Sequence, residues 1–556
     1  MTNKLMKRLS LFIIVLALCT LAACSGSSTE TTTEPEENKE AEQETPAPTE
    51  TSGEKSISIG ITQSPTSLNP LDRSNFVNWY VIQLLFPPLV QLDESMEFVP
   101  QLAENVEFID EQTVEVKLRP EAKWTDGTPV TVDDVLFTLG LMAHPEVSAL
   151  RATDFAILEG LNHVGKLESG DIESIGGVEK VDDHTIRFKT KAPVYPLDFQ
   201  ELILQNLSLL PKHVLGDVNP AQLFEHPFMQ APDVVYGPFK YVNYARNQYV
   251  ELEANPDYFL GAPKIDKLYF RITTPPNLVT MLESGDIDMN LPEMGQIPIN
   301  DYERVKNLAH IRTESGTPIT SSFLAPNNNK LTDKRVRQAI MYAINREMLV
   351  QNLLKGEGEV SYGPYPPIHP LYNEEVVKGT YPYDPEEAKR LLAEAGWDSG
   401  QTLMLSVMSG NVLFEQAANI ISENLRAVGI NTQIETMDQP TLVQKFLSGD
   451  FDLVFWTTRF ALYPDMSRTH GTGGSTNFTG YSNPEVDELF KKGLTETNPD
   501  KRYEIYSRWQ EIWVDDVPQM ELYFDYRLRA VNERVTTGEP KDIGMFINIH
   551  EWDVKE

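Results

Sequence analysis

Residues 402–457 alternate between strand-like and helix-like segments, and this pattern constrains the fold more than any other feature of the sequence. Strand-like segments at 402–408, 431–437 and 451–457 are separated by helix-like segments at 412–429 and about 441–447. Such alternation is typical of a parallel sheet with helical crossovers. Strands of such a sheet are buried on both faces, which explains the apolar run from Phe451 to Trp456. The sequence therefore predicts an α/β fold.

The apolar run ends in three polar residues, Thr457, Thr458 and Arg459. In open α/β sheets, ligands bind beyond the carboxyl ends of the strands. Arg459 could therefore hold a ligand carboxylate or carbonyl with two hydrogen bonds, or it could form a surface salt bridge, and the sequence leaves both roles open. For Trp456, packing in the core is the preferred interpretation over ligand contact.

Helix signals are strong on the amino-terminal side of this region. Asp384 is predicted to cap a helix that starts at Pro385 and stops at Gly396. Residues 333–356 are predicted as a further helix with Asp333 as its cap and Gly356 as its end, because their apolar residues share one stripe. Upstream, short strand-like segments (113–118, 185–190, 249–254 and 267–272) and a helix-like segment (132–142) indicate an irregular α+β region.

The first 24 residues have the organisation of a secretory leader. Basic residues in Met1–Ser10 precede the apolar segment Leu11–Leu18, and Leu-Ala-Ala-Cys follows at Leu21–Cys24. This tetrapeptide resembles the lipobox of bacterial lipoproteins, which implies that residues 1–23 are removed and that Cys24 is lipidated. The alternative is a leader cut elsewhere, with no role for Cys24. Since Cys19 and Cys24 are the only cysteines, the exported fold is expected to contain no disulfide and no thiolate metal site.

Residues 24–55 have the composition of a flexible tether. The segment 25–55 contains nine Glu and two Lys among Ser, Thr and Pro, with almost nothing apolar to offset the entropy of ordering. The whole chain carries a formal net charge of −35, which argues against binding to nucleic acid. We expect a soluble, self-repelling, monomeric fold that is held near a membrane.

Catalytic signatures are missing from the sequence. It contains no His-Glu-x-x-His, Gly-x-Ser-x-Gly, phosphate-loop or dinucleotide motif, and the nine histidines are scattered without metal-ligand spacing. Carboxylates are so abundant that a glycosidase stays formally open. A tethered hydrolase is therefore the alternative from a different class, and the prediction is that the protein is not an enzyme and uses no metal or cofactor.

A set of segments across residues 56–556 is informative when taken together: Thr113–Leu139, Tyr236–Phe270, Asp333–Gly358, Tyr383–Trp397 and Tyr481–Phe490. In this order they resemble the extracellular solute-binding proteins of ABC importers, family 5, which includes oligopeptide-, dipeptide- and nickel-binding lipoproteins. The resemblance implies a two-lobed, periplasmic-binding-protein-like fold (type II, or Venus-flytrap) that closes over a ligand. Lobe I would comprise residues 56–271 and 523–556 with an inserted α+β subdomain at about 89–187, and lobe II residues 272–522. The crossings between lobes would lie near Ile272 and Leu522.

The resemblance also implies two walls for the ligand site. One wall would be the strand end with Trp456, Thr457, Thr458, Arg459, Phe460 and Leu462. The facing wall would contain Ser74, Asn75 and Phe76, with Tyr236 and Gly237 nearby. In the peptide-binding members the ligand is held largely through its backbone, which suits a carrier of mixed peptides.

Leu462 departs from the family pattern. Many peptide-binding members have an aspartate at this position, which pairs with the α-amino group of the peptide. Since leucine cannot neutralise a buried ammonium, either another acid such as Asp465 takes over, or the ligand is not anchored by its N-terminus. The resemblance implies a lipid-anchored protein on the outer face of the cell membrane that captures oligopeptides and delivers them to an ABC permease. The alternatives within the family are an oligosaccharide, an opine or a metal chelate.

Overall fold

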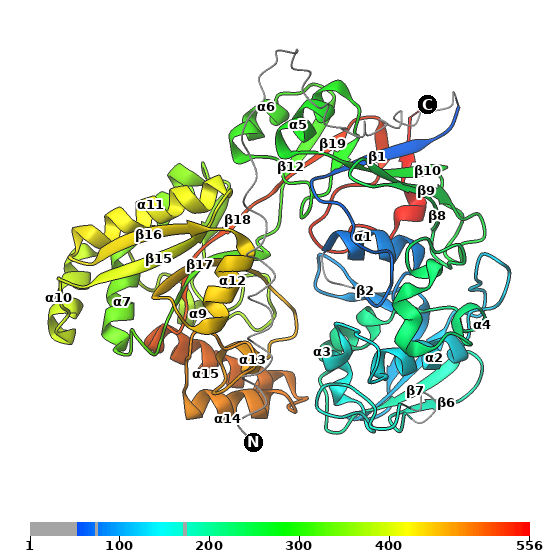
Figure 1. Cartoon of the computed structure of the whole chain (residues 1–556), viewed down its shortest axis with the longest axis horizontal. Coiled ribbons are helices and arrows are strands. Elements are labelled where there is room, and N and C mark those ends of the chain that lie inside the picture. Colours follow the sequence, from blue (N-terminus) through cyan, green and yellow to red (C-terminus); the bar gives the residue numbers. More distant parts are fainter. Residues whose placement is uncertain (1–52, 73–75, 171–174, 556) are drawn as a thin grey trace, which may run out of the picture. The chain divides into compact units, whose positions relative to one another are not determined.

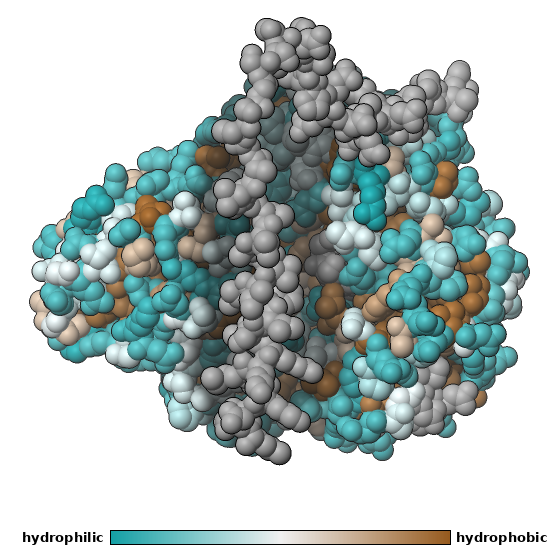
Figure 2. Space-filling model, in the orientation of Figure 1, coloured by the Kyte–Doolittle hydropathy of each residue, from teal (hydrophilic) through white to brown (hydrophobic). Residues whose placement is uncertain are grey.

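The computed structural model describes residues 53–72, 76–170 and 175–555 (Figure 1). The predicted leader, Cys24, nearly all of the predicted tether, and Ser74 and Asn75 lie outside these residues. Hydrophilic residues make up most of the visible described surface in Figure 2, in keeping with the strongly acidic composition. No helix within the described ranges is both long and apolar enough to span a bilayer.

The first sheet has seven strands in the order β12-β19-β11-β1-β10-β9-β8. Its central strand, β1 (Ser56–Ile61), is fully buried and runs parallel to β10 (Lys267–Ile272) and β11 (Met289–Asn290). The other strands are β8 (Phe239–Ala245), β9 (Tyr249–Ala254), β12 (Ile311–Ser315) and β19 (Leu528–Asn532). Because β19 pairs with both β11 and β12, the end of the chain completes the sheet that its beginning starts.

A smaller antiparallel sheet lies within the first part of the chain. Its strands are β4 (Ala103–Phe108), β5 (Thr113–Leu118), β7 (Thr185–Lys189) and β6 (Val178–Lys180), in that order. The same part of the chain contains α1 (Phe76–Leu85), α2 (Val132–Ala143), α3 (Pro196–Leu202) and the hairpin of β2 (Val90–Leu92) and β3 (Phe98–Pro100). One hydrophobic core joins these elements to the first sheet.

The second sheet contains the region of alternating segments. Its order is β14 (Gly358–Val360), β18 (Met520–Asp525), β13 (Thr320–Pro326), β17 (Leu453–Arg459), β15 (Thr402–Met408) and β16 (Asn431–Met437). The predicted parallel pairing holds for β15 with β16 and β17, which α11 (Val412–Ala427) and α12 (Gln439–Ser448) connect. The sheet as a whole is mixed, because β13 pairs antiparallel with β17 and β18. These strands are joined to their neighbours by long connections rather than by single crossover helices, so the parallel rule does not extend to them.

The predicted helix over residues 333–356 is interrupted. Asp333 caps α7 (Lys334–Ala343) as expected, with its carboxylate accepting the Arg335 amide at 2.9 Å. Ile344 then takes an extended conformation, and Asn345 caps a new turn, α8 (Arg346–Met348), by accepting the Met348 amide at 2.9 Å. The polar side chain of Asn345 thus competes with the helix, although the apolar stripe stays buried on both sides.

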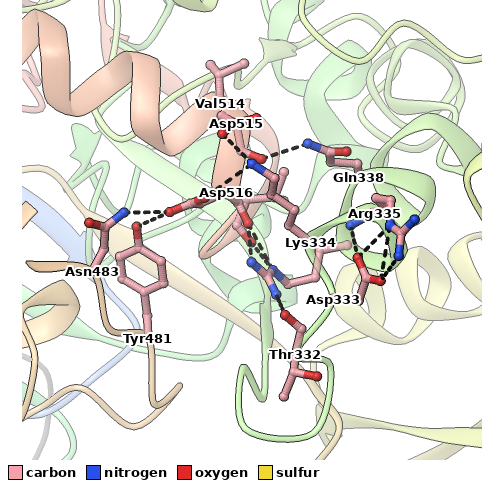
Figure 3. Close-up of polar contacts among 12 residues, drawn as sticks. Thr332, Asp333, Lys334, Arg335, Gln338, Tyr481, Asn483, Val514, Asp515 and Asp516 are labelled. Atoms are coloured by element: carbon pink, nitrogen blue, oxygen red, sulfur yellow. Dashed lines mark hydrogen bonds and ion pairs between the residues drawn. The ribbon is translucent and has the colours of Figure 1, made fainter. Parts of the chain in front are cut away.

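A polar network ties α7 to the end of α15 (Pro499–Asp516) (Figure 3). Arg337, which is 5% exposed, donates to the backbone carbonyls of Leu331 at 2.7 Å and of Asp516 at 2.5 Å. The Asp516 carboxylate accepts hydrogen bonds from the Tyr481 hydroxyl at 2.6 Å and the Asn483 amide at 2.9 Å. The end of α15 is therefore fixed by the Arg337 side chain, which satisfies the free carbonyl of Asp516.

Two short connections join the two large sheets. β12 ends at Ser315 and β13 begins at Thr320, while β18 ends at Asp525 and β19 begins at Leu528. The connections lie side by side, since the Gly316 amide donates to the Arg527 carbonyl at 2.8 Å. The crossings are thus at about 316–319 and 526–527 instead of near Ile272 and Leu522, because the chain returns to the first sheet after α5 (Pro275–Ser284). We propose that lobe I comprises residues 56–315 and 528–556, and that lobe II lies between them.

Candidate ligand-binding site

The end of β17 lines a cavity of about 360 Å³ in lobe II, which we call the side cavity. Trp456 and Thr458 lie opposite Phe323 and Ser321 of β13, and all four side chains line this cavity. Thr457 lies opposite Ser322 instead. Because successive residues of a strand point to opposite faces, Thr457 does not line the cavity with its neighbours. Of the first three candidates on this wall, the structure brings Trp456 and Thr458 together.

A second cavity of about 340 Å³, the interlobe cavity, lies between the residues that follow β17 and lobe I. Its lobe II side is formed by Ala461 and by three candidates from the sequence, Arg459, Phe460 and Leu462. Phe76 is its only described residue from the predicted 74–76 segment. The rest of the lobe I lining comes from α1, α3, the β2 segment and residues 543–545, together with Arg151, Gln205 and Asn206.

Arg459 lines both cavities and makes structural contacts at the same time. Its guanidinium donates to the Asp542 carbonyl at 2.8 Å, lies 3.9 Å from the Glu293 carboxylate and stands 5.1 Å from the centre of the Phe76 ring. Arg459 therefore contacts lobe I and also lines the cavities. The sequence could not choose between these two roles because each needs only a cation at the end of the strand.

Leu462 is 4% exposed and packs against Leu92, Ile319 and Ile543. Its backbone amide donates to the Glu201 carboxylate at 3.2 Å, and the amide of Tyr463 donates to the same carboxylate. Burial raises the pKa of Glu201 to about 7. The acid next to this position therefore comes from α3 in the facing lobe and holds the backbone of the loop.

Tyr236 and Gly237 belong to the core of lobe I. Neither lines the described cavities, and Tyr236 is fully buried, with its hydroxyl donating to the Pro87 carbonyl at 2.7 Å and its ring 5.0 Å from that of Trp124. A Cβ at Gly237 would come within 2.1 Å of the Leu84 carbonyl oxygen. The structure therefore places these two residues in the core against α1, and they are not among the proposed ligand contacts.

The floor of the side cavity carries buried polar groups. Glu521 of β18 is 3% exposed and accepts hydrogen bonds from the hydroxyl of Ser321 and from the Gln519 amide at 2.6 Å. Burial raises the pKa of Glu521 to about 7, and burial lowers the pKa of His470 in the same lining to about 4. Asp465, the acid named by the sequence analysis, also lines this cavity, and burial raises its pKa.

A further contact between the lobes lies beside a third cavity of about 260 Å³. Asp198 of α3 and Arg502 of α15 form an ion pair at 2.5 Å, with side chains that are 3% and 2% exposed. Tyr195 lies 4.5 Å beneath the guanidinium of Arg502. These contacts and those of Glu201 join the same two lobes on either side of Leu462.

Sequence reasoning missed Glu201, Glu521 and the cavity-lining part of α1. Glu201 and Glu521 are two of many acids in the chain, and neither belongs to a recognisable motif. The continuation of the Phe76 wall into Tyr80 and Gln83 could have been found from the helical spacing of that segment. Within the described ranges, no group of three or more His, Cys, Asp or Glu side chains could hold a metal ion.

The fold and the cavity between two lobes define a class of solute-binding proteins. Residues 97–480 match the bacterial extracellular solute-binding proteins, family 5. The chain belongs to this family, whose members are substrate-binding proteins of ABC transporters and not enzymes. The predicted two-lobed α/β fold is confirmed by solved structures with TM-scores of 0.74 and 0.79.

Two relatives illustrate the similarity. The chain is 26% identical over 515 residues to the oligopeptide-binding protein AppA of Bacillus subtilis, covering 89% of this chain and 90% of AppA. The structure of that AppA in complex with a nonapeptide has a TM-score of 0.74 and 26% identity, covering 90% of this chain and all of the other. The substrate-binding protein CtaP of Listeria monocytogenes has a TM-score of 0.79 and 24% identity over 90% of this chain and all of its own.

Proposed function

We propose that this protein captures oligopeptides outside the cell membrane and delivers them to an ABC permease. The observation that carries the proposal is the match along almost the whole chain to AppA, whose solved complex contains a nonapeptide. The side and interlobe cavities both border residues 459–461, so a chain-like ligand could occupy both. We further propose that lipidated Cys24 anchors the mature protein, as the lipobox-like sequence suggests.

Phe76, Trp456, Thr458, Arg459, Phe460 and Leu462 are the proposed ligand contacts that remain from the sequence analysis. These contacts are proposed because the residues line the two cavities. The interlobe cavity is lined by residues of both lobes. Closure of this kind removes water from the ligand and strengthens polar contacts to it.

The proposal is tested by titration calorimetry and thermal unfolding of the purified protein with peptide pools, oligosaccharides and nickel chelates. Ligand binding to the folded state raises the unfolding temperature, by an amount that depends on ligand concentration over Kd. We expect a rise with peptides only. A rise with sugars or chelates and none with peptides would contradict the proposal and identify the other solute class. Mass measurement of the membrane-bound form, compared with a Cys24→Ser variant, tests the anchor separately.

A further inference from the structure

The side cavity has aromatic walls on nearly every side. Strands β13, β17 and β18 supply part of its lining, and loops and helix ends of lobe II supply the rest. The aromatic lining residues are Phe323, Tyr365, Phe446, Trp456, Phe460, Tyr463, Phe478, Trp513 and Phe524. Faces of aromatic rings carry partial negative charge and attract cations. An uncharged apolar ligand group would suit these aromatic walls, but the cavity lining also contains carboxylates.

Two carboxylates, Glu521 and Asp465, line the cavity without a cationic partner. The hydrogen bonds of Glu521 come from neutral groups: the hydroxyls of Ser321 and Ser361, and the Gln519 amide. Those of Asp465 come from the amide and hydroxyl of Ser467. Among the ion pairs of the described chain, none includes either acid.

No nearby arginine of the described chain forms an ion pair with either acid. Burial raises the pKa of Asp465, the charges of Arg468 and Arg502 act in the opposite direction without such a pair, and Arg502 is paired with Asp198. Arg459 contacts Glu293 and the Asp542 carbonyl, while the guanidinium of Arg346 donates to the carbonyls of Ser361, Thr380 and Tyr381 and, at 3.4 Å, of Glu521. His470 supplies no charge at neutral pH, because burial lowers its pKa to about 4. The cavity therefore has an excess of acidic groups over cations.

His470 is a further polar residue of this lining. It is 6% exposed, and its Nδ1 is 2.9 Å from the Thr469 hydroxyl. Burial lowers its pKa, and a side-chain hydrogen bond with Gln519 acts in the opposite direction. Gln519 also donates to Glu521, so only neutral groups connect the imidazole to this carboxylate.

We propose that the side cavity is a subsite for a cationic group on an apolar stem, with Glu521 as its charge partner. The inference rests on the proposed function and specifies its ligands as peptides that place a lysine or arginine side chain, or the N-terminal ammonium, in this cavity. The stem would pack on the aromatic walls while the cation meets the carboxylate. Burial now holds the pKa of Glu521 at about 7, so an adjacent cation would restore the charged form of this acid.

The position of the cavity allows a bound peptide to reach it. Arg459, Phe460 and Ala461 line both the side cavity and the interlobe cavity. A peptide backbone over these residues could extend one cationic group toward Glu521. This arrangement also gives the chain an acid for ligand recognition even though position 462 is leucine.

The test uses titration calorimetry with alanine-based nonapeptides in which one lysine is moved along the sequence, each compared with norleucine at the same position. A second pair compares free and acetylated N-termini. We expect at least one lysine position, or the free N-terminus, to bind about tenfold more tightly than its neutral counterpart, as for a close ion pair. Glu521→Gln should abolish this preference. Glu423→Gln, on an exposed part of α11, should retain it.

The outcomes separate the two proposals. Equal affinity for cationic and neutral peptides, or a preference that survives Glu521→Gln, overturns the subsite and leaves peptide binding intact. Failure of every peptide to bind overturns the proposed function. If thermal unfolding shows that Glu521→Gln is unfolded, Asp465→Asn replaces it, with an expected loss of about threefold of the preference. In the unaltered protein, equal binding of every cationic peptide and its neutral counterpart is by itself enough to overturn the subsite.

Discussion

Leu462 stands at the position where the family resemblance leads us to expect an acid, and its surroundings match a hydrocarbon side chain. Leu92, Ile319 and Ile543 pack around it, and its backbone amide donates to the Glu201 carboxylate. An acid at position 462 would lie in an apolar cluster and close to a second carboxylate. The apolar side chain at position 462 is therefore compatible with the neighbouring Glu201 carboxylate, whereas a second acid there would be repelled by it.

Replacing Leu462 with Asp should lower the free energy of unfolding by about 2–4 kcal/mol, because the new carboxylate loses hydration without gaining a cation. Leu462→Met keeps the volume and should change the free energy by less than about 1.5 kcal/mol. Urea unfolding followed by tryptophan fluorescence measures both variants. Wild-type stability of the Asp variant would show that this position opens to solvent.

At the scale of helices and strands, Arg337 joins the first turn of α7 to the last residues of α15. Its donors meet the backbone carbonyl of Asp516, which ends α15, and that of Leu331 in the loop before α7. Arg335, two residues earlier, instead forms an exposed ion pair with Asp333. Arg337 is thus a buried arginine, and Arg335, in the same helix turn, is an exposed arginine that serves as its control.

Arg337→Ala should reduce the free energy of unfolding by about 2–4 kcal/mol, because several buried carbonyls lose their donor. Arg335→Ala should cost less than about 1 kcal/mol, as expected for a surface ion pair. Chemical unfolding of both variants provides the comparison. Equal losses would show that the buried contacts of Arg337 contribute no more than a surface ion pair.

Local patterns predicted the elements better than their long-range pairing. The strands β15, β16 and β17 and the caps at Asp333 and Asp384 follow from spacing and side-chain chemistry within a few residues. The antiparallel strands β13 and β18 could not be placed, because their partners are distant in sequence. The site shows the same division: Arg459 follows a recognisable strand, whereas Glu201 becomes relevant only when α3 meets that strand's end.

For the whole molecule, two buried acids give stability a defined dependence on pH. Burial raises the pKa values of Glu201 and Glu521 to about 7 from an ordinary value of 4.5. Between these pH values the folded chain binds more protons at these sites than the unfolded chain. Their contribution to stability is therefore fully present below about pH 4.5 and is lost as pH rises through about 7.

Glu201→Gln should reduce this dependence by about 1–3 kcal/mol between pH 4.5 and 7.5, since glutamine does not titrate. The free energy of unfolding in urea is measured at several pH values for this variant and for the exposed control Glu423→Gln. The control should keep the wild-type slope. An unchanged slope in Glu201→Gln would show that the acid is ionised throughout the range.

The position of β19 has a consequence for the order of assembly. This strand lies between β12 and β11, so the first sheet lacks one internal strand until residues 528–532 have been synthesised. During synthesis from the amino terminus, β1 and β10 are therefore made long before β19 can complete their sheet. Nascent lobe I must wait for nearly the entire polypeptide, which couples the maturation of both lobes to the last strand pairing.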